Sequence, residues 1–145
     1  MKKILIILLL TLATILPTFA TNWVQFYEKG YIDIDTIEPY VNDSGRVVPN
    51  QYSFWTKFLN DGSEFWRKYE KIYNKKFWYI YRRCIIDVNR KASAIKMIII
   101  YDLKGNVVDR HEYSYLEWES IVPNTIGDFE LFIIKQVING VPVEE

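Results

Sequence analysis

Hydrophobic and polar residues alternate along six stretches of this chain, which is the pattern of β-strands with one buried face. The clearest stretch is 77–88, where Ile80 and Cys84 fall on one side and Tyr79 and Tyr81 on the other. Because strand side chains point to opposite faces in turn, this pattern predicts a sheet with two different faces. The six stretches are residues 23–28, 31–35, 47–59, 77–88, 92–102 and 107–113.

Turn residues mark where several of these strands end. Polar connections at 89–91 and 104–106 separate the last three strands, and connections this short join antiparallel neighbours. These three strands are therefore expected to form a meander. Further upstream, Glu38 and Pro39 are expected to end the strand that begins at Tyr31, because proline lacks the backbone donor that a strand needs.

The hydrophobic period changes after residue 63, which predicts a short helix over 64–76. Ser63 is expected to cap its first turn, and Lys75 and Lys76 place positive charge at its C-terminal end. A long irregular hairpin arm is the alternative structure for this segment. The expected apolar face of the helix comprises Phe65, Tyr69, Ile72 and Tyr73.

A second helix is predicted near the C-terminus. Thr125 and Asp128 resemble a capping box with aspartate in place of glutamate, and Asn139 with Gly140 forms a stop signal. The residues between them recur with helical spacing. Its expected apolar face comprises Ile126, Phe129, Ile133, Ile134 and Val137.

These elements predict an α+β fold, with a single antiparallel β-sheet of about five or six strands and a C-terminal helix packed on one face. A sheet covered on one side leaves its other face in contact with solvent. The exposed face and the edge strands are then the natural surfaces for contact with partners, including a second copy of the chain in a homodimer.

The first twenty residues have the build of a secretory signal peptide. Lys2 and Lys3 precede an apolar stretch over 4–17, and the small residue Ala20 suits cleavage by signal peptidase. Residues 1–20 are therefore expected to be removed, leaving an exported domain over 21–145 in the periplasm or on the cell surface. The alternative is an uncleaved anchor, for which the longer stretch over 4–20 has the minimum length. Past Ala20, the sequence has no apolar run long enough to span a bilayer.

Charge balance excludes one broad class of partner. The 145 residues carry 18 basic and 18 acidic side chains, and loss of Lys2 and Lys3 leaves a slight excess of acid. Such a domain has no general electrostatic attraction to nucleic acid or to anionic lipid. Its size corresponds to one domain, and after cleavage it has no stable membrane span.

Charge is nevertheless distributed unevenly along the chain. Basic residues dominate 68–91 and are interleaved with aromatic ones, whereas acidic residues dominate 102–145. Basic and aromatic side chains together can bind an acidic protein, a glycan or a phosphate group. The alternative is that the basic segment pairs with the acidic half of the chain. The residues expected to bind a ligand are Tyr79, Tyr81, Arg82 and Arg83, of which Tyr79, Tyr81 and Arg83 share the outward side of their strand.

The sequence contains no motif typical of a catalytic, cofactor or metal site. The protein is therefore expected not to be an enzyme and to bind no cofactor and no metal. Metal sites need clustered His, Cys or carboxylate ligands, but His111 and Cys84 are the single residues of their kinds. Asp33 and Asp35 could form a carboxylate pair, but a solvated strand face is the simpler interpretation. Cys84 is expected to be a buried small hydrophobic residue, with an intermolecular disulfide or a reactive thiol as alternatives.

Several short motifs occur in a fixed order along the chain, at residues 31–33, 54–57, 86–91, 100–108, 118, 121–123 and in the C-terminal helix as far as Val137. Their order and spacing resemble the bacterial surface-adhesin protein E family. The resemblance covers nearly all of the expected mature chain. Val88 and Gln136 stand where members commonly carry cysteines, which suggests that a family disulfide is lost here.

This resemblance implies an exported protein with a sheet and a helix that acts without catalysis. The best-known members of the family act as surface adhesins for host extracellular-matrix and serum proteins. For this chain, it implies an interaction module for an extracellular protein or glycan. A periplasmic protein with a housekeeping or structural role in the envelope is the alternative.

Overall fold

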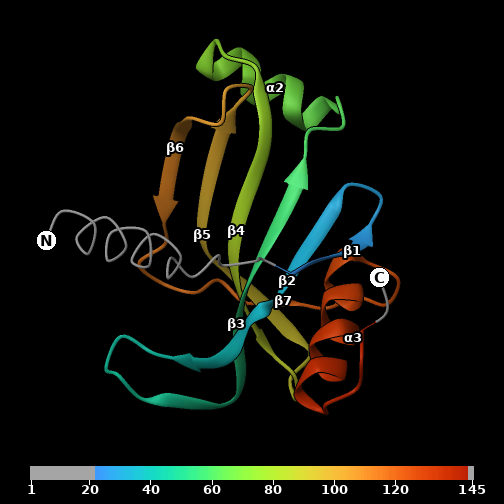
Figure 1. Ribbon diagram of the computed structural model, residues 1–145. Coiled ribbons are helices and arrows are strands. Elements are labelled where there is room, and N and C mark those ends of the chain that lie inside the picture. Colours follow the sequence, from blue (N-terminus) through green and yellow to red (C-terminus); the bar gives the residue numbers. More distant parts are fainter. Residues whose placement is uncertain (1–21, 144–145) are drawn as a thin grey trace, which may run out of the picture.

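The computed structural model describes residues 22–143, and the expected signal peptide over 1–20 lies outside that part of the chain. The fold is an antiparallel sheet with strand order β1-β2-β3-β4-β5-β6, and a short β7 pairs with β5 (Figure 1). The strands are β1 Trp23–Tyr27, β2 Gly30–Val41, β3 Val47–Leu59, β4 Phe77–Asp87, β5 Ala92–Asp102, β6 Val107–Glu112 and β7 Glu119–Ser120. The helices are α2 Glu64–Tyr73 and α3 Ile126–Ile138. The predicted α+β fold is confirmed.

Two features of the sheet differ from the sequence prediction. Strand β2 continues through Glu38 and Pro39, which were expected to end it. Its partner β1 pairs with β2 only as far as Asp33, so the second half of β2 is an edge where Pro39 costs no ladder hydrogen bond. The second difference is β7, because an element of two residues is too short to produce an alternating pattern.

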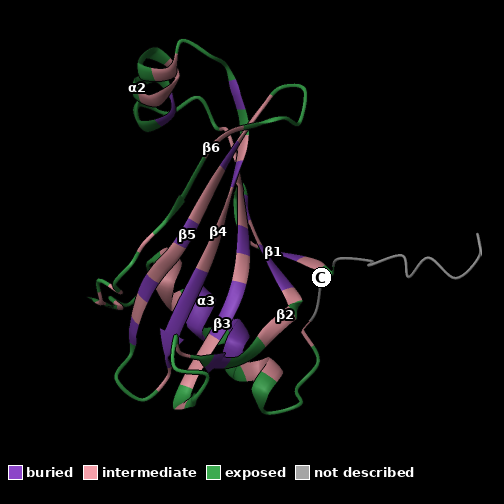
Figure 2. Ribbon diagram, turned by 90° about the vertical axis from the view of Figure 1, so that its left-hand side faces the viewer, coloured by how far each residue is buried: buried purple, intermediate pink, exposed green. Residues whose placement is uncertain are grey.

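Both helices pack on the same face of the sheet, which we call the helix face. In β4 this face bears Ile80, Arg82, Cys84 and Ile86. Helix α3 covers a hydrophobic cluster at one end of the sheet, and α2 covers a smaller cluster at the other end. Figure 2 shows buried residues concentrated where α3 meets the strands. The buried members of the larger cluster are Val24, Ile32, Phe54, Cys84, Ile86, Leu131, Ile133 and Ile134.

Helix α2 confirms the predicted element and half of its predicted apolar face, because Tyr69 and Tyr73 pack against the smaller cluster. Phe65 and Ile72 are 54% and 64% exposed, and the buried side chain is Trp66. Trp66 packs against Phe77, with their ring centroids 6.5 Å apart. Helical spacing therefore identified part of the buried side of α2 and missed Trp66. It ends at Asn74, which has a left-handed conformation.

Helix α3 begins and ends where predicted, but its capping differs. The Thr125 hydroxyl donates to the carbonyl of Val122, and the Asp128 carboxylate accepts from the backbone N–H of Asn124. The expected capping box is therefore replaced by two bonds to the preceding loop. Ile133 and Ile134 are buried as expected. Phe129 is 42% exposed, because the buried face of α3 instead includes Leu131 and Glu130.

The outer half of the β2–β3 hairpin bends back over the other face of the sheet. Asp43, in the hairpin turn, lies 3.7 Å from Lys96 of β5, although β3 and β4 separate β2 from β5 in the sheet. Glu38 of β2 likewise lies 3.8 Å from Arg83 of β4. Figure 1 shows this arm (teal) extending toward the side of β5 and β6.

No helix within residues 22–143 has the length and apolar composition needed to cross a membrane.

Close packing around Gly30 gives a test of the fold. A Cβ atom at Gly30 would lie 2.9 Å from the Phe58 ring and 3.2 Å from Cβ of Tyr27. We expect Gly30→Ala to lower the free energy of unfolding by about 1–3 kcal/mol through overpacking, measured by urea denaturation. Gly127→Ala is the matched control, because its nearest side-chain atom, on Ile121, is 3.4 Å away and helix propensity favours alanine. Equal stabilities of the two variants would contradict the packing around Gly30.

Candidate binding face

The four residues predicted to bind a ligand lie on two faces of β4. Tyr79, Tyr81 and Arg83 share the face opposite the helices, which we call the open face. Arg82 lies on the helix face and forms an ion pair with Glu130 of α3, with 2.9 Å between nitrogen and oxygen. The structure therefore brings three of the four residues together and separates Arg82 from them.

Five aromatic rings contact one another on the open face. The ring centroids of Tyr79 and Tyr101 are 4.6 Å apart in a stacked arrangement, and those of Tyr79 and Tyr81 are 5.0 Å apart. Tyr81 also stacks on Trp23 at 5.5 Å and meets the edge of Trp55 at 6.4 Å. Such contacts add to the stability gained by burial alone. We call Trp23, Trp55, Tyr79, Tyr81 and Tyr101 the aromatic cluster.

Strand register explains why residues from four strands meet here. Tyr79 is paired with Tyr101 of β5, and Tyr81 is paired with Lys57 of β3. Trp23 and Trp55 are both paired with Asp33 of the intervening strand β2, from opposite sides. Directly opposed and diagonal cross-strand residues are the pairs that interact on a sheet face. The cluster is thus built across β1, β3, β4 and β5.

Two cations border the aromatic cluster. The ammonium nitrogen of Lys57 lies 4.8 Å from the centre of the Tyr79 ring and 6.0 Å from that of Trp23. Both distances lie in the range of cation–π attraction. The side chain of Arg83 is 38% exposed, and its long ion pair with Glu38 leaves it accessible to solvent. The open face therefore combines aromatic surface with positive charge.

Burial within the cluster raises the pKa of two of its tyrosines. Burial raises the pKa of Tyr81 to about 12, with smaller contributions from the neighbouring Tyr79 and Tyr101. Burial also raises the pKa of Tyr79. Both phenols stay neutral at physiological pH and act there as hydrogen-bond donors or acceptors.

Asp33 differs from the expected solvated carboxylate. It is 3% exposed, whereas Asp35 is exposed. Burial raises the pKa of Asp33, although a hydrogen bond from the backbone N–H of Asp35 opposes that change. Its position between Trp23 and Trp55 in the register accounts for the burial.

On the helix face, Arg82 lies in a closed environment. Its guanidinium donates to Glu130 and to the Thr56 hydroxyl, and it lies 4.2 Å from the centre of the Phe58 ring. Arg82 is also the one base of segment 68–91 that pairs with an acid of the C-terminal half among the described residues. Internal pairing, the alternative weighed for the basic segment, thus holds for this residue.

Cys84 and His111 were considered for thiol or metal chemistry, and they lie in the core and on the surface, respectively. Cys84 is a free, buried cysteine, and burial raises its thiol pKa to about 12. The thiol is therefore protonated and shielded, as its interpretation as a small hydrophobic residue predicted. His111 is exposed on β6, with its ring 4.5 Å from that of Tyr113.

These observations define a class of protein: a single antiparallel sheet with helices on one face and a partly open aromatic face on the other. Solved structures of Haemophilus influenzae protein E share this fold. One, from a non-typeable strain, is 16% identical with a TM-score of 0.53, covering 88% of this chain and 86% of that chain. A second is 14% identical with a TM-score of 0.52, covering 88% of this chain and 94% of that one. A third, in crystal form II, is 16% identical with a TM-score of 0.51, covering 81% and 91%.

The chain therefore has a protein E-like fold, in agreement with the resemblance found in its sequence. At these identities, the similarity concerns the fold alone. No family model matches the sequence, and no curated protein matches it either.

The raised pKa of Tyr81 predicts an alkaline loss of stability. Below the ordinary phenol pKa of 10.0, both folded and unfolded states keep the proton, so the contribution of this group is fully present. As pH rises from 10.0 toward about 12, the unfolded state releases the proton first and stability falls. We expect Tyr81→Phe to lose stability less steeply in this window, measured by urea denaturation across the pH range. An unchanged slope would contradict the burial of this phenol.

The different surroundings of the two adjacent arginines predict different mutational costs. Removing Arg82 leaves Glu130, whose side chain is 4% exposed, without its partner, so we expect Arg82→Met to cost about 3 kcal/mol of stability. Arg83→Met is the matched control and should cost under about 1 kcal/mol, because its pair with Glu38 is exposed. Thermal unfolding of both variants provides the measurement. Similar losses in the two would show that Arg82 is not a structural residue.

Proposed function

We propose that this protein is an exported, non-enzymatic interaction module that binds an extracellular protein through the open face. The observation that carries the proposal is the aromatic cluster on a sheet face that neither described helix covers. Tyrosine and tryptophan supply much of the binding energy at protein interfaces, since they bury large apolar areas and retain a polar group.

Charge around the cluster favours a partner with acidic groups. Lys57 and Arg83 lie beside the rings and bring positive charge to the face. Charges at the border of an interface mainly raise the association rate and exclude partners of like charge. Arg82 is assigned to the structure of the domain rather than to binding, because its guanidinium is engaged by Glu130 and Thr56.

Two further arguments support this function. The fold is that of protein E, and the sequence resembles a family of surface adhesins. The expected signal peptide over 1–20 provides the route of export. The alternative is an envelope-housekeeping role in the periplasm. The location of the protein in the cell distinguishes these two functions.

Protease treatment of intact cells tests the location. We expect the protein to be digested on intact cells, as a surface protein would be. Cells with a permeabilised outer membrane provide the control, because both surface and periplasmic protein are accessible there. Protection on intact cells and digestion after permeabilisation would place the protein in the periplasm and contradict an adhesin function.

Substitutions on the open face test the binding mode. The purified domain is applied to immobilised extracellular-matrix and serum proteins, with heparin as a glycan probe. We expect Tyr79→Ala to weaken binding by about tenfold or more, since losing one central interface aromatic costs about 2 kcal/mol. Arg83→Glu should slow association, because it reverses the local charge.

Matched control variants lie away from the open face. Tyr115→Ala removes a tyrosine that is 71% exposed, and Lys68→Glu reverses an exposed charge on α2. Both controls should bind as the unmodified protein does, and circular dichroism checks that each variant is folded. Equal losses in control and open-face variants would contradict the proposed site. Binding to heparin alone would contradict a protein partner.

A further inference from the structure

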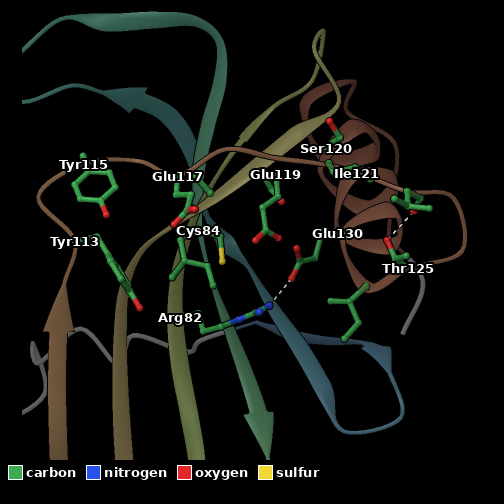
Figure 3. A pocket seen from close by; sticks show the side chains of 16 residues that line it. Arg82, Cys84, Tyr113, Tyr115, Glu117, Glu119, Ser120, Ile121, Thr125 and Glu130 are labelled. Carbon is green, nitrogen blue, oxygen red and sulfur yellow. Dashed lines mark hydrogen bonds and ion pairs between the residues drawn. The ribbon is translucent and has the colours of Figure 1, made fainter.

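A cavity of about 590 Å³ lies on the helix face, between strands β4 and β5, the segment 113–125 and the start of α3 (Figure 3). Its size is within the range of small-molecule sites. Arg82 and Glu130 form its inner wall, and Glu117 and Glu119 enter it from the segment that includes β7. This cavity is separate from the open face, since it lies on the other side of the sheet.

Glu130 is the buried polar group of this cavity. Its side chain is 4% exposed and points from α3 into the cavity (Figure 3). Oε1 accepts a hydrogen bond from Arg82, whereas Oε2 has no hydrogen-bond partner among residues 22–143. In the same part of the chain, every fully enclosed side-chain oxygen or nitrogen has a partner. The free oxygen of Glu130 is therefore reached through the cavity.

The charges that line the cavity are mostly negative. Three glutamates face one arginine, and that arginine is already paired with Glu130. Within the described chain, neither Glu117 nor Glu119 forms an ion pair. The start of α3 also lines the cavity, but the acidic Asp128 in its first turn offsets the positive end of the helix dipole. An added positive group would thus be attracted here, and an added anion repelled.

The geometry points to a small organic cation with amino groups as the ligand of this cavity. An ammonium group supplies three hydrogen-bond donors, which suits the free oxygen of Glu130 and the carboxylates of Glu117 and Glu119. The aliphatic part of such a ligand would contact Ile95 and Ile121, which also line the cavity. Tyr113 offers a ring for cation–π attraction.

A metal ion fits this lining less well. A metal needs several ligand atoms that converge on one point, and the described residues contain no group of three His, Cys, Asp or Glu side chains able to hold one. The carboxylates are instead spread around the cavity. An extended cation with two amino groups can reach separated carboxylates, whereas a single ion cannot.

Three probes with five-carbon chains and different end groups test this inference. Isothermal titration calorimetry with the purified domain compares 1,5-diaminopentane, 1,5-pentanediol and glutarate. We expect binding of the diamine, weakened by salt, and no binding of the diol or the dianion. Binding of the diol at equal strength, preferential binding of glutarate, or no binding of the diamine at millimolar concentration would each overturn the inference.

Variants locate the bound diamine. Glu117→Gln combined with Glu119→Gln changes exposed residues and should leave the fold intact, while weakening diamine binding by about three- to tenfold. Glu112→Gln, on the exposed edge strand β6 and outside the cavity, is the charge-matched control and should bind as the unmodified domain does. Equal weakening by control and cavity variants would show diffuse attraction and overturn the site. Tyr79→Ala should leave diamine binding unchanged, which separates this cavity from the proposed protein-binding face.

Discussion

The ion pair between Arg82 and Glu130 fixes α3 against the centre of the sheet. It lies between the hydrophobic cluster under α3 and the smaller cluster under α2, and Phe58 of the smaller cluster packs against the same guanidinium. A buried pair adds little net stability over a hydrophobic replacement, but it penalises any arrangement that separates the two charges. A rotation or sliding of α3 would leave Glu130 buried without a partner. The pair therefore selects one position for the helix.

The two faces of the sheet differ in what they contain, and the Arg82–Glu130 pair belongs to one of them. On the helix face, α3 and its pair with Arg82 enclose a core and leave an acidic cavity beside it. On the open face, the adjacent Arg83 points to solvent beside the aromatic cluster. Because side chains alternate along β4, Arg82 is part of the packed interior and its neighbour Arg83 is part of the open surface.

Sequence alone predicted both helices and every strand except the two-residue β7, because these elements depend on local periodicity and turn residues. It also placed Tyr79, Tyr81 and Arg83 on one side of β4. It did not predict that Trp23, Trp55 and Tyr101 would join them, because strand order and register decide which residues are neighbours. The buried Trp66 of α2 and the partner of Arg82 were missed for a related reason: tertiary contacts, not helical spacing, determine both.

The edge strands of this sheet are poorly suited to pairing with a strand of another molecule. Strand β1 has only five residues, the free half of β2 contains Pro39, and β6 carries the charged or polar run Asp109, Arg110, His111 and Glu112. Short, proline-containing and charged edges all resist the addition of a foreign strand. A domain with such edges can expose an aromatic face at high local concentration without forming fibrils through β-strand pairing between molecules.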